Sequence, residues 1–129
     1  CLKAGLEEVP VYRQAFSFVL DLNHWLESGP PDFFESNGIL QRVYRHALRV
    51  PADIAGGHGL GYEEETLCGN IVKNRWALRH ARKVQQLLKD WSGRPGVRRL
   101  PVGFCERVDA VILALTDRIR TLRSKVWWA

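Results

Sequence analysis

The stretch PVGFCERVDAVILALTDRIRTLRSKV, residues 101–126, has the clearest helical pattern in the chain. Its large apolar side chains recur every three or four residues, the spacing that places them on one side of an α-helix. They are Phe104, Val108, Val111, Ile112, Leu115, Ile119, Leu122 and Val126. A helix with one apolar side must bury that side against other elements. The stretch therefore predicts an all-α fold packed around this helix.

Three earlier segments, at about residues 8–27, 34–54 and 62–91, show the same period. Their expected core residues are Val9, Tyr12, Phe16, Val19, Leu20 and Leu26 in the first segment, Ile39, Leu40, Val43, Ala47, Val50 and Ile54 in the second, and Leu67, Ile71, Leu78, Ala81, Val84, Leu88 and Trp91 in the third. Asn74 and Gln85 interrupt the third stripe. They either lie inside the core with hydrogen bonds, where polar residues can fix register, or lie just outside it.

Glycine and proline separate the four segments, at residues 28–31, 56–61 and 92–99. Pro51 lies inside the second helix and predicts a kink followed by one more turn. The glycines at 56–61 are expected to end that helix, and their order does not match the nucleotide-binding pattern G-x-G-x-x-G. Short connections favour antiparallel neighbours. We therefore predict one domain over residues 1–129, an antiparallel up-down-up-down four-helix bundle.

Charge is unevenly distributed between the two halves of the chain. Residues 1–70 hold five lysines and arginines and ten aspartates and glutamates, a net charge of −5, whereas residues 71–129 carry a net charge of +10. This asymmetry indicates an anionic partner for the second half. It could instead serve association, with the acidic half of one subunit against the basic half of another.

Several functional classes find no support in the sequence. The longest apolar run, residues 110–115, is far shorter than the ~20 residues that span a bilayer, and the first residues lack a signal-peptide pattern. We expect a cytoplasmic protein with no membrane partner. It has three cysteines, Cys1, Cys68 and Cys105, an odd number with no close pair. We expect them to be reduced thiols that pack in the interior. No spacing of cysteine, histidine or carboxylate residues indicates catalysis or a metal, so we predict no enzyme and no cofactor.

The segment LRVPADIAGG, residues 48–57, resembles the (S/V)IPANIAEG signature of a bacterial four-helix-bundle family. That family is encoded in intervening sequences of the large ribosomal RNA gene and is related to the accessory variability proteins of diversity-generating retroelements. The segment YEEETL, residues 62–67, follows where the family begins its third helix, although Asp53 and Gly56 replace the usual Asn and Glu. The resemblance implies a ring-shaped homopentamer, association with nucleic acid and, for the retroelement proteins, a reverse transcriptase partner.

Basic residues repeat at spacings of three and four on one face of the second and of the third predicted helix, and others lie close together near the end of the fourth. These candidate nucleic-acid-binding residues are Arg42, Arg45 and Arg49, then Arg75, Arg79, Arg82 and Lys83, and finally Arg118, Arg120 and Arg123. Arginine has a planar fork that suits phosphate oxygens, and each neutralised phosphate releases counterions. The alternative is an ordinary solvated helix face, which every surface helix needs.

Three tryptophans, Trp76, Trp127 and Trp128, lie close to these basic residues. Flat rings can stack on unpaired bases, yet tryptophan is also enriched in subunit interfaces. For all three the sequence favours an oligomer interface. We thus expect a non-enzymatic homo-oligomer that binds RNA or DNA. The alternative is an assembly or adaptor protein whose charge asymmetry serves subunit contacts and a protein partner.

Overall fold

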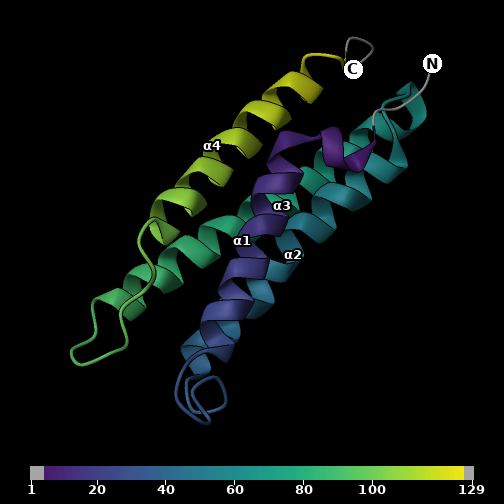
Figure 1. The fold of residues 1–129 in the computed structure, drawn as a ribbon. Coiled ribbons are helices and arrows are strands. Elements are labelled where there is room, and N and C mark those ends of the chain that lie inside the picture. The colour runs from purple at the N-terminus through teal and green to yellow at the C-terminus, as the bar shows by residue number, and fades with distance from the viewer. Residues whose placement is uncertain (1–4, 127–129) are drawn as a thin grey trace.

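The computed structural model describes residues 5–126, which form four α-helices and one short 3-10 helix, with no strand among these residues. The elements are η1 (Leu6–Glu8), α1 (Pro10–Glu27), α2 (Gly38–Leu60), α3 (Glu64–Ser92) and α4 (Phe104–Arg123). The helices lie side by side in an elongated bundle (Figure 1). Helix α2 packs against α1 and α3, and α4 packs against α3 and α1. The all-α, four-helix prediction is confirmed. Within residues 5–126, none of the helices combines the length and apolar content that a bilayer crossing requires.

The apolar core consists of three clusters along the bundle. The largest is rich in aromatic rings, and Trp25 of α1 packs edge-on against Trp91 of α3 with ring centroids 6.5 Å apart. The stripes predicted for α2, α3 and α4 are buried, apart from Leu78, Ile112 and Val126, which are half-buried. Periodicity therefore identified the inner faces of these three helices.

The stripe predicted for α1 is partly wrong. Phe16 and Leu20 are 45% and 55% exposed, whereas the buried residues of α1 are Val11, Ala15, Phe18, Val19, Leu22, Trp25 and Leu26. Both sets recur at helical spacing, so the period alone does not choose between them. The rings of Phe18 and Trp25 decide the orientation, because they pack on Phe104 of α4 at centroid distances of 5.0 and 6.3 Å.

The glycine-rich segment 56–61 is a second correction, because it is helical almost to its end. Helix α2 passes through Pro51 and continues to Leu60, well beyond the single extra turn that was predicted. Gly57 is buried where α3 approaches, and a Cβ at this position would lie 2.6 Å from Oδ1 of Asn70. Its missing side chain thus allows the two helices to pack closely. Gly61 ends the helix with a φ of 104°, a conformation that favours glycine.

Candidate nucleic-acid interface

Helix α2 presents a row of cations opposite its buried stripe. Ile39, Val43, Ala47, Val50 and Ile54 are buried against the neighbouring helices. Helical spacing then leaves a second set outside, and Arg42, Arg45 and Arg49 are all exposed. The same sequence pattern that builds the core therefore orients these three arginines toward solvent.

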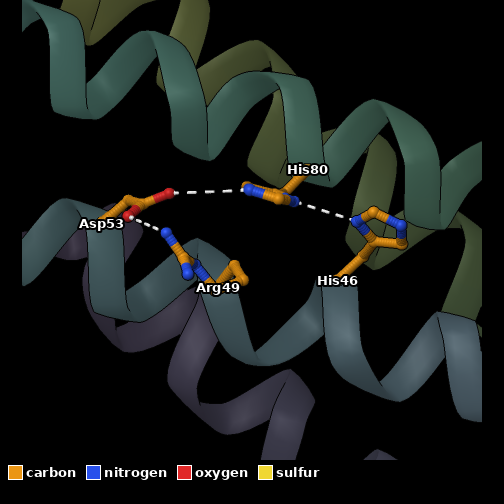
Figure 2. Close-up of polar contacts among 4 residues, drawn as sticks. All are labelled: His46, Arg49, Asp53 and His80. Carbon is orange, nitrogen blue, oxygen red and sulfur yellow. Dashed lines mark hydrogen bonds and ion pairs between the residues drawn. The ribbon is translucent and has the colours of Figure 1, made fainter.

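Two histidines join this row to the cations of α3. The Nδ1 atoms of His46 on α2 and His80 on α3 lie 2.9 Å apart, within hydrogen-bond distance. Nε2 of His80 lies 3.9 Å from Oδ2 of Asp53, and Nη2 of Arg49 donates to Oδ1 of the same carboxylate at 3.4 Å. Figure 2 shows His46, Arg49 and Asp53 on α2, with His80 reaching toward them from α3. The four side chains form one continuous polar chain across the α2–α3 junction.

The positions of these groups favour one arrangement of protons. Asp53 is 4% exposed, and its Oδ2 makes no hydrogen bond within the described residues. A proton on Nε2 of His80 would face that oxygen favourably and leave Nδ1 of His80 as an acceptor. His46 then donates from its own Nδ1. The carboxylate thereby favours this tautomer of His80 without a hydrogen bond, since the two atoms are 3.9 Å apart.

Both histidines have a lowered pKa. Burial is the main cause for His46, followed by the charge of His80, and burial is also the main cause for His80. Asp53 opposes the effect at His80. The cations that lower these two pKa values further are Arg42, Arg45, Arg49, Arg79 and Lys83. Both rings are therefore mostly neutral at neutral pH, and the positive charge here belongs to arginine and lysine.

We call these five cations the α2–α3 basic face: Arg42, Arg45, Arg49, Arg79 and Lys83. Four of them are exposed and Lys83 is half-buried. The remaining candidates on α3, Arg75 and Arg82, are also exposed, but helical geometry puts them on the far side of Arg79 from His80. The structure thus brings together half of the basic residues that the sequence singled out.

The candidates on α4 lie elsewhere, because α4 packs mainly against α3 and α1. Arg120 is exposed and pairs with Asp117 at 2.9 Å, and Arg123 is exposed. Arg118 is half-buried and bound inside the protein. Its Nε donates to Oδ1 of Asn74 at 3.0 Å, and its Nη2 donates to the hydroxyl of Tyr62 at 2.7 Å. Two nitrogens of the Arg118 guanidinium are therefore already used inside the protein.

Asn74 belongs to a buried hydrogen-bond network, which decides between the two alternatives left open for this residue. Its Nδ2 donates to the backbone oxygen and to Oδ1 of Asn70, at 2.9 and 2.8 Å, and Asn70 donates to the backbone oxygen of Gly61 at 3.0 Å. Gln85 is half-buried at the edge of the core and donates to Asp109 at 2.7 Å. The network joins the end of α2 to α3 and, through Arg118, to α4.

Trp76 projects from α3 with 39% of its surface exposed. The ammonium of Lys73 lies over its ring, 4.8 Å from the centroid. Trp127 and Trp128, the other interface candidates, lie outside the described residues. No described contact tests an oligomer interface at Trp76.

The expected burial of the cysteines is wrong for Cys68, which is exposed. Cys105 is half-buried, and burial together with the nearby carboxylates Glu106 and Asp109 raises the pKa of its thiol. Its thiolate is therefore disfavoured, which suits a packing role. Within residues 5–126, no group of three or more histidine, cysteine or acidic side chains could hold a metal ion.

Sequence reasoning missed His80 and Asp53 as parts of this region. His46 and His80 are 34 residues apart, so no local spacing reveals their contact. Arg49 and Asp53 do have the four-residue spacing of a helical ion pair, which was an available signal. No family model matches the chain, and neither a curated protein nor a solved structure is significantly similar to it.

Proposed function

We propose that this protein is a non-enzymatic homo-oligomer that binds RNA or DNA through the α2–α3 basic face. The contact between His46 and His80 carries the proposal, because it draws cations from two helices onto one strip. Asp53, the carboxylate that faces these cations, is only 4% exposed, so it adds little negative charge to the surface that a ligand would contact. The strip therefore presents a concentration of positive charge to an external polyanion.

A phosphate backbone is the polyanion that fits such a row of arginines. Arginine donates two parallel hydrogen bonds to phosphate oxygens, and each phosphate contact releases condensed counterions. Arg49 pairs with Asp53, and the side chain of Arg49 is still 54% exposed. A partly fixed guanidinium loses less conformational entropy when it binds. No base-reading element is implied, so we expect little sequence preference.

The proposal has four finer features. We infer an antiparallel bundle, because the core pairs Trp25, late in α1, with Leu40 early in α2, Leu88 late in α3 and Phe104 at the start of α4. The resemblance of residues 48–67 to the intervening-sequence family supports a ring-shaped homopentamer. The same resemblance suggests a reverse transcriptase as a further partner, and a cytoplasmic location suits this role.

The test is a salt titration of nucleic-acid binding with matched charge-neutral variants. We expect log K against log salt to have a negative slope, with each phosphate contact contributing about −0.7 to −0.9. The double variant Arg45→Gln/Arg79→Gln should lose at least about tenfold in affinity at low salt and flatten the slope. Its control, Arg94→Gln/Arg99→Gln, removes the same charge from exposed residues between α3 and α4. Equal losses in both pairs, or binding insensitive to salt, would overturn the proposal.

The second candidate, an assembly or adaptor role, is favoured by a different surface. Phe16 and Leu20 lie one turn apart on α1 and are both largely exposed, and Phe16 stacks on Tyr12 at a centroid distance of 5.8 Å. Exposed apolar side chains that adjoin one another are typical of protein contacts. Mass measurement of a Phe16→Ser/Leu20→Ser variant tests this candidate. A lower oligomeric state supports a subunit contact here, and an unchanged state counts against one.

A further inference from the structure

Trp76 lies on the same face of α3 as the basic residues around it. Lys73 is three residues before it, and Arg79 and His80 are three and four residues after it, so all four project from one face of the helix. Helical geometry puts Trp76 between the directions of His80 and Arg79. The indole is therefore flanked by Arg79, a member of the α2–α3 basic face, and by His80, whose contact with His46 joins the two helices.

The position of Lys73 is also defined. The stem of this side chain lies over Gly56 of α2, with Cδ 3.6 Å from where a Cβ would be. Its ammonium lies 4.8 Å from the centroid of the Trp76 ring. The lysine thus bridges from α2 to the indole and restrains it, while 39% of Trp76 stays exposed. A restrained, partly exposed ring beside phosphate-binding cations can accept another flat group at low entropic cost.

Duplex and single-stranded nucleic acids differ in whether they can supply that flat group. Inside a duplex, both faces of each base are covered by neighbouring bases. A single strand has bases free to stack on protein aromatic rings, and any base has a suitable π-face. Cations that follow the backbone, together with an aromatic ring that stacks a base, are the combination used by proteins that bind single strands without sequence preference.

We infer that the ligand of the α2–α3 basic face is single-stranded RNA or DNA, with Trp76 stacking on an unpaired base and Lys73 beside it contacting the backbone. This inference rests on the proposed nucleic-acid function and adds the class of strand that is bound. It also gives Trp76 a role different from the subunit interface expected from the sequence.

The experiment compares Trp76→Leu and Trp76→Phe with the unmodified protein. Binding is measured to oligothymidylate of about 16 nucleotides, the upper end of single-strand site sizes for small domains, and to a duplex of the same length. We expect Trp76→Leu to weaken oligothymidylate binding about 5- to 150-fold, the range for loss of one stacked base. Trp76→Phe should restore part of that loss, because it keeps a ring. Duplex binding should change by less than about twofold, since phosphate contacts alone support it.

Two controls separate stacking from indirect effects. Phe16→Leu removes a ring of similar exposure from α1 and should leave both affinities unchanged. Quenching of tryptophan fluorescence by oligothymidylate should fall in Trp76→Phe, a change that a purely structural residue would not produce.

The possible failures are distinguishable. If both strand forms bind in a salt-dependent way and Trp76→Leu changes neither affinity, the stacking inference is overturned and the proposed function stays intact. A lower oligomer mass for Trp76→Leu would assign this residue to a subunit interface and also overturn the inference. Absence of binding to either form would overturn the proposed function and the inference together.

Discussion

The α2–α3 junction holds two polar clusters, and they differ in how their arginine is used. The arginine of the outer cluster is exposed, whereas that of the inner cluster donates its hydrogen bonds inside the protein. In the outer cluster, Arg79 is exposed beside the His46–His80 pair, where its charge lowers the pKa of His80. In the inner network, Arg118 gives its hydrogen bonds to Asn74 and the Tyr62 hydroxyl. The difference is the supply of acceptors, because the inner network offers buried neutral oxygens and the outer strip offers few. An exposed arginine such as Arg79 can donate to an external anion, whereas Arg118 already uses two of its nitrogens inside the protein.

The largest effect should come from breaking the inner network. Asn74 is fully buried and both donates to Asn70 and accepts from Arg118. We expect Asn74→Ala to lower the free energy of unfolding by about 3 kcal/mol, because it removes one acceptor from the half-buried Arg118 guanidinium and the donor that binds the buried Oδ1 of Asn70. Urea denaturation measures this. The control Gln85→Ala removes an edge hydrogen bond to Asp109 and should cost less than about 1 kcal/mol. Equal costs would mean that the network is not what secures this junction.

Two glycines of α2 test how closely the helices approach. At Gly57 an added Cβ would lie 2.6 Å from Oδ1 of Asn70 and 3.1 Å from its backbone oxygen, and at Gly59 it would meet nothing within 4 Å. Gly57→Ala should therefore destabilise by about 1–3 kcal/mol through overpacking. Gly59→Ala should instead stabilise by about 0.5–1 kcal/mol, since alanine favours helix over glycine. Thermal denaturation of both variants checks the signs, and a shared sign would contradict the close packing at Gly57.

Substitutions of Arg79 and Arg118 should have smaller effects and should affect different quantities, nucleic-acid affinity for Arg79 and stability for Arg118. Arg79→Gln should weaken nucleic-acid binding by about tenfold or less at low salt and change the free energy of unfolding by less than about 0.5 kcal/mol. Arg118→Gln should do the opposite, lowering stability by about 1–3 kcal/mol with little loss of binding. Filter binding and urea denaturation on the same preparations measure both quantities. The contrast between the clusters fails if Arg118→Gln weakens binding more than Arg79→Gln does.

The lowered pKa values of His46 and His80 make stability depend on pH. Each folded-state pKa lies below the ordinary value of 6.5, so between the two values the unfolded chain binds more protons than the folded one. Stability should therefore fall as pH drops through 6.5 and level off below the folded pKa values. Urea midpoints across this range measure the change. His46→Gln/His80→Gln should reduce the pH dependence, and a double variant with the same pH dependence as the unmodified protein would contradict this cause.

The sequence determined more of the fold than of the candidate interface. The stripes in α2 and α4 were predictable, because each helix has one dominant apolar face at helical spacing. In α1 two overlapping stripes exist, and only the packing of Phe18 and Trp25 on Phe104 chooses between them. The need for glycine at position 57 was equally hidden, because the atoms that a Cβ would meet belong to Asn70 of another helix.

The same distinction explains the arginines. Local spacing predicted that Arg42, Arg45 and Arg49 share a face, because that property belongs to one helix. It could not show that His80 brings Arg79 to the same strip, or that Asn74 and Tyr62 already occupy Arg118, since those partners come from distant parts of the chain. Whether an arginine can bind a ligand thus depends on the tertiary structure around it, even though the residue itself is evident in the sequence.

Titration of His46 and His80 by NMR, with and without oligothymidylate, tests most directly whether nucleic acid occupies the α2–α3 basic face. Phosphates bound to the surrounding cations would offset the charges that lower the pKa values of His46 and His80. We predict that both pKa values rise on binding. Unchanged pKa values for His46 and His80 in the saturated complex would contradict the account.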